Sequence, residues 1–139
     1  MRGARALLVG LEVLAALNAV GGGLYALAGA RDVPREWLEG TPFDDYTIPG
    51  ILLLVGAGVM VVAATMVLAG ARAATAFSGA AGALLVMWIV VQVAMIGYVS
   101  WMQPASFAAG LIIIALASVF ARNTRELKTP GGELAGRSA

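Results

Sequence analysis

The residues of this chain that could take part in chemistry are few and lie within long apolar stretches. One of them is ionisable, Glu12, which stands among apolar residues with no basic residue beside it. The others carry amides or hydroxyls: Asn18, Thr65, Ser78, Gln92 and Ser118. Removal from water favours the neutral form of a carboxyl group, so we expect Glu12 to be protonated and to donate a hydrogen bond.

Distance along the chain predicts that four of these side chains lie at a similar depth. Each is seven positions or fewer from a basic residue at the end of its stretch, which is about 10 Å or less at a helical rise of ~1.5 Å per residue. The four come from different stretches: Glu12, Thr65, Ser78 and Ser118. We therefore expect an intramembrane polar cluster. Glu12 within it has either a structural role, including contact with another subunit, or a proton-carrying role.

Two amides match at a different depth. Asn18 lies thirteen residues beyond Arg5, and Gln92 lies six residues before Tyr98, so both belong to the opposite part of the bilayer. This match predicts an interhelical hydrogen bond between Asn18 and Gln92, with Trp88 on the same helical face as Gln92. Such a bond contributes on the order of 1 kcal/mol to helix association in a membrane.

The elements that position these residues are four apolar stretches. A bilayer core of about 30 Å needs roughly 20 apolar residues in a helix. Four stretches reach or approach this length: 6–30, 48–71, 73–102 and 105–121. They are continuously apolar, whereas the strands of a membrane barrel alternate. Because the connections at 71–73 and 102–104 are short, neighbouring helices must be antiparallel. The sequence predicts an all-α membrane protein, an antiparallel bundle of four transmembrane helices, followed by a flexible tail at 122–139.

The basic residues predict how these helices are oriented. Seven of the nine lie at the chain ends and in the connection at 71–73, and two lie in the loop after the first stretch. The positive-inside rule then places both termini in the cytoplasm. Aromatic residues suit the opposite boundary: Tyr25, Trp37, Tyr46, Tyr98 and Trp101. The basic start of the first stretch is also typical of a signal peptide, but its length and its polar residues favour a retained span.

The loop at 31–47 is the main extramembrane feature and is rich in acidic residues. Pro34 near its start and Gly40 near its middle predict one or two helical turns between them. Its candidate docking residues are aromatic or acidic: Trp37, Phe43, Asp44, Asp45 and Tyr46. The alternative is a solvated loop in which Asp44 or Asp45 caps the following helix. Two adjacent carboxylates fall short of the about six oxygens that a hard cation prefers, so no metal site is predicted.

Composition excludes several classes of protein. The chain is 60% hydrophobic and 12% charged, whereas soluble domains have about 25% charged residues. It contains no Cys and no His, which excludes disulfides, Ser-His-Asp or Cys-His catalytic sites and nearly all zinc, iron and haem sites. No phosphate-binding glycine loop and no basic, aromatic surface for nucleic acid is found. We therefore expect no enzyme activity, no cofactor and no nucleic-acid partner.

Two segments carry a resemblance to known membrane proteins. The segment WLEGTPFDDYTIPG at 37–50, together with the segment that runs from IVVQ at 89–92 through GYVSW at 97–101, looks like parts of uncharacterised small four-span membrane proteins of high-GC bacteria. The resemblance covers most of the chain except the tail. The layout is also loosely similar to that of DoxX-like four-helix proteins, without a motif diagnostic of that group. Neither resemblance implies a reaction, a cofactor or a binding site at particular residues.

These patterns, together with the resemblance, predict a bacterial inner-membrane protein without enzyme activity that has an accessory or scaffolding role in a larger membrane assembly. The small residues along the predicted helices and the acidic, aromatic loop favour contact with a protein partner or with further copies of the chain. The first alternative is a small transporter or channel, built from several copies, with Glu12 as its protonatable residue. The second alternative is a lipid-binding membrane protein.

Overall fold

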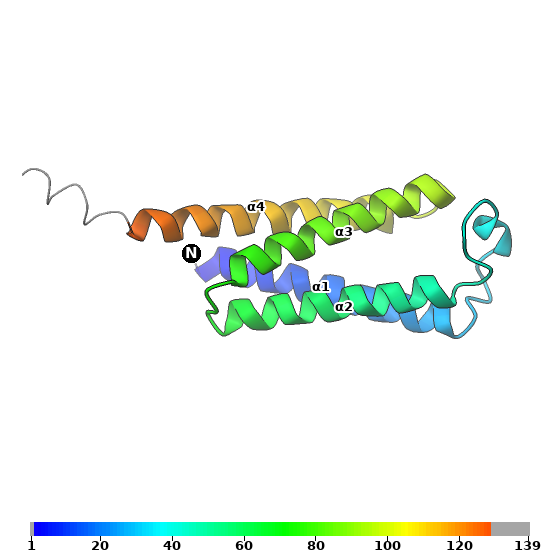
Figure 1. Cartoon of the computed structure of the whole chain (residues 1–139), viewed down its shortest axis with the longest axis horizontal. Helices are drawn as coiled ribbons and strands as arrows, with labels where there is room; N and C mark the ends of the chain where they lie inside the picture. Colours follow the sequence, from blue (N-terminus) through cyan, green and yellow to red (C-terminus); the bar gives the residue numbers. More distant parts are fainter. Residues whose placement is uncertain (1, 129–139) are drawn as a thin grey trace, which may run out of the picture.

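The computed structural model describes residues 2–128, and within this range it contains four α-helices and one short 3-10 helix. The elements in chain order are α1 (Arg2–Leu27), η1 (Arg35–Leu38), α2 (Thr47–Leu68), α3 (Ala74–Ile96) and α4 (Met102–Lys128) (Figure 1). A helix satisfies its backbone hydrogen bonds internally, which is what a continuously apolar segment requires in lipid. All four α-helices are long and apolar enough to cross a membrane.

The helices run antiparallel and are grouped in two pairs. α1 packs along α2, and α3 packs along α4, whereas contacts between the pairs are fewer and run mainly from α2 to α3. α1 and α3 lie on a diagonal of the bundle without direct backbone contact. Both ends of the described chain lie at one end of the bundle, and η1 lies at the other (Figure 1). This arrangement confirms the predicted antiparallel four-helix bundle.

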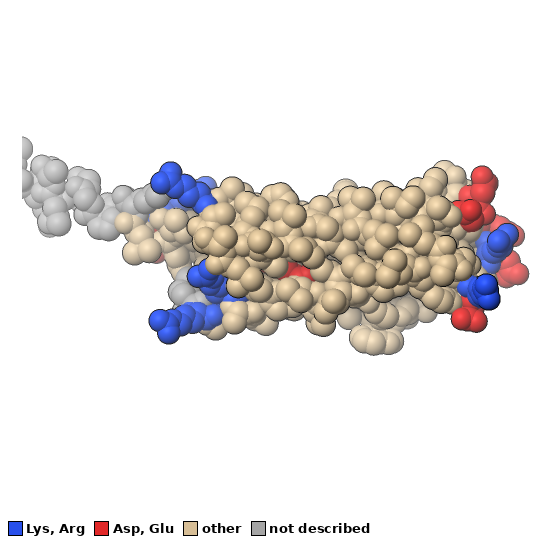
Figure 2. Space-filling view, turned by 90° about the horizontal axis from the view of Figure 1, so that it is seen from below, with Lys and Arg blue, Asp and Glu red and all other residues tan. Residues whose placement is uncertain are grey.

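On the face that Figure 2 shows, charged side chains gather at the two ends of the molecule, and the surface between the ends is uncharged apart from one small acidic patch. The end that holds the start of α1 carries Arg2, Arg5, Arg72, Arg122 and Arg125. The opposite end carries Arg31, Arg35, Asp32, Glu36, Glu39, Asp44 and Asp45. An apolar middle with charged ends is the surface that a bilayer selects. The chain is a multi-pass membrane protein.

Within each pair of helices, glycine allows a close crossing. A Cβ atom added at Gly23 of α1 would lie 2.9 Å from the carbonyl oxygen of Gly50 in α2. A Cβ atom added at Gly82 of α3 would likewise lie 2.9 Å from the carbonyl oxygen of Gly110 in α4. Small residues at helix interfaces let backbones approach in lipid, where the hydrophobic effect gives no drive for association. The two helices of each pair are therefore close enough for their backbones to be in contact.

Buried side chains concentrate in the half of the bundle nearer the basic end. The main cluster takes residues from all four helices: Leu8, Ala16, Met60, Ala63, Val67, Ala74, Ala81 and Ile113. Alanine dominates this cluster, which keeps the two helix pairs close where they meet.

Several helix boundaries differ from the predicted spans; α2, for example, ends at Leu68 instead of residue 71, and α4 begins at Met102 instead of residue 105. The first span was expected to reach residue 30, but α1 ends at Leu27 because Gly29 adopts a φ of 101° that terminates the helix. The third was expected to reach residue 102, but α3 ends at Ile96 because Gly97 has a φ of 74°. α4 continues past residue 121 to Lys128, since residues 122–128 are mostly good helix formers. That part of the predicted flexible tail is helical, and residues 129–139 lie outside the described range.

Gln103 closes the turn between α3 and α4, a role that sequence analysis did not identify. Its side chain is 4% exposed. Oε1 accepts hydrogen bonds from the backbone N–H groups of Val99 at 2.9 Å and Ser100 at 3.4 Å, and Nε2 donates to the Gly97 carbonyl at 3.1 Å. A single amide thereby satisfies three backbone groups of the turn between α3 and α4.

Candidate functional site

Glu12 and Ser78 form the polar centre of the bundle. Both side chains are 0% exposed. The Ser78 hydroxyl lies beside the Glu12 carboxyl across the diagonal between α1 and α3, although neither side chain reaches hydrogen-bond geometry with any described group. A buried polar group without a partner costs free energy comparable to a lost hydrogen bond. Glu12 and Ser78, two members of the predicted polar cluster, therefore lie side by side. Their side chains make no hydrogen bond in this arrangement.

Thr65 and Ser118 do not join this centre, contrary to the predicted four-residue cluster. Both side chains are exposed. The Thr65 hydroxyl donates to the Val61 carbonyl at 2.8 Å, and the Ser118 hydroxyl donates to the Ile114 carbonyl at 2.8 Å. Bonding back to the carbonyl four residues earlier satisfies a hydroxyl on any face of a helix, so no inward orientation is required.

Ser118 instead lines a shallow groove between α3 and α4. The groove has a volume of about 340 Å³ and is lined mainly by small or hydroxyl-bearing residues, including Thr75, Gly79, Ala117 and Thr124. It lies near the basic end of the bundle, away from Glu12. Ser118 therefore faces this groove on the surface of the bundle and does not face Glu12.

Asn18 and Gln92 are also not brought together, so the predicted amide pair is not formed in the described structure. Asn18 is exposed on α1, and Gln92 is half-buried on α3. Because α1 and α3 are diagonal neighbours, the backbones at this depth do not come into contact. Among the described residues no hydrogen bond of either amide is found.

The exposed amide of Asn18 lies beside a notch in α1. Gly21 and Gly22 follow it by three and four residues and thus share its side of the helix. A Cβ atom added at Gly21 would meet nothing within 4 Å. Asn18 is thirteen residues from Arg5, or about 20 Å into the membrane. α1 therefore presents an unsatisfied amide and the open backbone of Gly21 to the hydrocarbon region. Gly22 lies at the edge of the contact with α2, where an added Cβ atom would lie 3.4 Å from Cδ1 of Leu53. We call Asn18, Gly21 and Gly22 the amide notch.

Arg5 links α1 to the end of α2, and sequence analysis did not identify this contact. Its Nη2 atom donates hydrogen bonds to the carbonyl oxygens of Val67 at 2.6 Å and Leu68 at 2.9 Å. The last turn of α2 contains no basic residue of its own. A cation at the C-terminus of a helix satisfies its free carbonyls and complements its dipole. The missing basic residue in the last turn of α2 is the feature of the sequence from which a contact by a basic residue of another helix could have been predicted.

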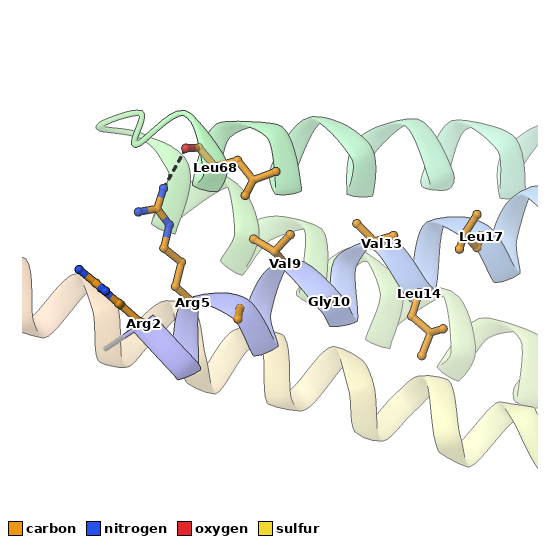
Figure 3. A pocket seen from close by; sticks show the side chains of 9 residues that line it. Arg2, Arg5, Val9, Gly10, Val13, Leu14, Leu17 and Leu68 are labelled. Carbon is orange, nitrogen blue, oxygen red and sulfur yellow. Dashed lines mark hydrogen bonds between the residues drawn. The ribbon is translucent and has the colours of Figure 1, made fainter.

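A groove runs along the outer surface of α1 from this contact (Figure 3). Its volume is about 580 Å³. Arg2 and Arg5 lie where α1 begins, and apolar residues continue along the helix beyond them (Figure 3). The apolar lining includes Ala6, Val9, Gly10, Val13, Leu14 and Leu17. We call this feature the α1 groove.

Side chains of the loop at 31–47 and of α1 hold this loop in place through hydrogen bonds. The Tyr46 hydroxyl donates to the Pro34 carbonyl at 2.7 Å, and the Tyr25 hydroxyl donates to Oδ2 of Asp32 at 3.0 Å. η1 occupies the centre of the segment expected to be helical. The buried Leu38 belongs to η1, which contacts α3.

The candidate docking residues of the loop differ in exposure. Trp37, Phe43 and Tyr46 are half-buried, while Asp44 and Asp45 are exposed. Oδ1 of Asp45 accepts a hydrogen bond at 2.9 Å from the backbone N–H of Thr47, the first residue of α2. This bond lowers the pKa of Asp45 below its usual value, and partial burial raises the pKa of Tyr46. The loop is therefore an ordered cap whose docking role remains a prediction.

Comparison with known proteins gives no match to a family model, to a curated protein or to a solved structure. Within residues 2–128 no group of three or more acidic side chains lies close enough together to hold a metal ion.

Proposed function

We propose that the chain is a subunit of a larger membrane assembly, with an accessory or scaffolding role, and that the amide notch of α1 contacts a transmembrane helix of its partner. The observation that carries this proposal is the exposed position of Asn18 at membrane depth, without a partner in its own bundle. Lipid chains offer an amide no hydrogen bond, so a partner helix is the environment that satisfies it.

The neighbouring glycines support the same contact. Because a side chain at Gly21 would meet nothing within 4 Å, the notch is open from outside. A second helix can approach the backbone there and place a polar group against Asn18. Amides that bond across helices in membranes contribute on average ~0.6 kcal/mol and at most about 2 kcal/mol. Asn18 therefore selects the partner and its register, while close packing over the glycines supplies most of the association energy.

Purification of the full chain from native membranes in mild detergent tests this proposal. The wild-type chain is expected to elute with a partner at fixed stoichiometry, and Asn18→Leu and Gly21→Leu are expected to release it. Thr65→Leu is the matched control for the first variant, because Thr65 is exposed but bonds within its own helix. Gly58→Leu is the control for the second, because Gly58 is equally open. Retention of the partner by both α1 variants would contradict the proposal.

Single cysteines decide whether the partner is a second copy. The chain contains no cysteine, so Gly21→Cys introduces one thiol per molecule. If two copies meet at the amide notch, oxidation in membranes yields a disulfide-linked dimer. If the partner is another protein, the thiol stays monomeric while co-purification persists.

We also propose that the chain lies in a bacterial inner membrane with both of its ends on the cytoplasmic side. The distribution of basic residues supports this orientation. Arg72→Cys and Glu39→Cys place single thiols at opposite ends of the bundle. A reagent that cannot cross the membrane is expected to label the second variant in intact cells and the first only after lysis. Labelling of Arg72→Cys in intact cells would contradict this orientation.

Proton or ion transport is the second candidate function, favoured by the complete burial of the Glu12 carboxyl without a hydrogen-bond partner. Intramembrane ionisable residues are frequent in proton and ion pathways. Liposomes that contain the purified chain are then expected to show a flux that Glu12→Gln abolishes and Ser118→Ala does not. Absence of flux above that of empty liposomes would remove this candidate.

A further inference from the structure

The α1 groove combines an apolar lining with two guanidinium groups at one end. We propose that it binds one anionic phospholipid of the leaflet at the basic end of the bundle. The acyl chain lies along Val9, Gly10 and Leu14, and the phosphate lies at Arg2 and Arg5 (Figure 3). This site is separate from the amide notch, which lies farther along α1.

The length of the α1 groove matches one leaflet. Arg5 and Leu14 are nine residues apart, which corresponds to about 14 Å along a helix. Half of a ~30 Å hydrocarbon core is about 15 Å. A lipid whose phosphate is held at Arg5 thus keeps its chain beside α1 for the full depth of its own leaflet.

The charged end of the groove suits a phosphate. Guanidinium groups bind phosphate oxygens through paired hydrogen bonds. Arg5 is held in place by the carbonyls of Val67 and Leu68, and these bonds use Nη2. In the part of the chain that the structure describes, Arg2 has no hydrogen-bond or ion-pair partner. One arginine is therefore positioned by the fold, and the other is available to the ligand.

The composition of the lining favours an anionic headgroup over a zwitterionic one. The described residues around the groove include two arginines and no acidic residue, so a choline or ethanolamine group finds no counter-charge there. Basic sites on membrane proteins at the surface of a leaflet attract anionic lipids by ~1 kcal/mol per charge. Each arginine is then expected to strengthen binding roughly fivefold.

The apolar part of the groove is hollow because Gly10 has no side chain. A Cβ atom added there would meet nothing within 4 Å, so a larger residue fills the groove without disturbing the bundle. Gly10→Leu therefore blocks the acyl chain and leaves both arginines intact. Gly58→Leu on α2 is the matched control, since Gly58 is open in the same way.

Native mass spectrometry of the full chain in detergent tests the proposal, with phosphatidylglycerol and phosphatidylcholine of identical acyl chains as probes. The wild-type chain is expected to bind one phosphatidylglycerol at least roughly fivefold more tightly than phosphatidylcholine. Arg2→Gln is expected to reduce that preference roughly fivefold, and Gly10→Leu to abolish the single tight site. Arg31→Gln, at the opposite end of the bundle, and Gly58→Leu are expected to bind as the wild type does.

Three results would overturn the proposal. The first is equal affinity for the two lipids. The second is wild-type binding of phosphatidylglycerol by Gly10→Leu, which would place the lipid elsewhere. The third is displacement of phosphatidylglycerol by an equal concentration of glycerol 3-phosphate, which would show a site for a free anion. Because Gly10→Leu alters no charge and Arg2→Gln alters no packing, loss of folding in one variant leaves the other decisive.

Discussion

Both halves of α1 have a surface that is exposed outside the bundle, but the polar groups on these two surfaces lie at different depths. On its exposed surface, the half near the basic end carries Arg2 and Arg5 at the boundary, with apolar residues deeper along the α1 groove. The other half carries its polar group, Asn18, well inside the hydrocarbon region beside open glycine. Depth decides the partner that each half requires. A cation at the boundary is satisfied by a headgroup, whereas an amide in the hydrocarbon region is satisfied only by protein.

The largest expected effect separates the outward side of α1 from the side that packs against α2. A Cβ atom at Gly23 would lie 2.8 Å from Cγ of Leu54, whereas one at Gly21 meets nothing within 4 Å. We expect Gly23→Leu to destabilise the bundle by about 3 kcal/mol or to prevent folding. Gly21→Leu should preserve monomer stability, because leucine is also the better helix former. Unfolding in mixed micelles, followed by circular dichroism, measures both, and equal stabilities would contradict this assignment of sides.

A smaller effect distinguishes the two arginines of the α1 groove. Arg5→Gln removes two hydrogen bonds to the end of α2 and is expected to destabilise the bundle by about 1–2 kcal/mol. Arg2→Gln is expected to change stability by less than about 0.5 kcal/mol. The same unfolding measurement applies. A larger loss for Arg2→Gln would show that Arg2 supports the fold instead of facing a lipid.

The smallest expected effect concerns the opposite end of α2, where Asp45 accepts the first N–H of the helix. Its folded-state pKa is lowered, so the bond stabilises the loop above the unfolded-state pKa and is lost as the pH falls through the folded-state pKa. Hydrogen exchange at the Thr47 amide is expected to lose protection over that acidic range. Asp45→Asn keeps an acceptor oxygen but does not titrate, so it should show no such step. An identical step in both proteins would assign the effect to another group.

The sequence predicts the number of helices and their antiparallel order, because apolar length and short connections determine both. It also predicts that Glu12 meets Ser78, since their depths match. It does not predict which side of each helix faces inward. Every side of a membrane helix is apolar, so the hydrophobic pattern that marks the buried side of a soluble helix is absent. Thr65, Ser118 and Asn18 are exposed instead of facing their predicted partners for this reason.

The length of α4 has a further consequence. Its 27 residues extend about 40 Å, roughly 10 Å more than the hydrocarbon core. The excess lies beyond Ala121 and bears Arg122 and Arg125. Because α4 is one continuous helix to Lys128, this extension follows the direction of the span beyond the hydrocarbon core. A fluorescent reporter fused there would report the tilt of the whole bundle, because no hinge separates it from the membrane.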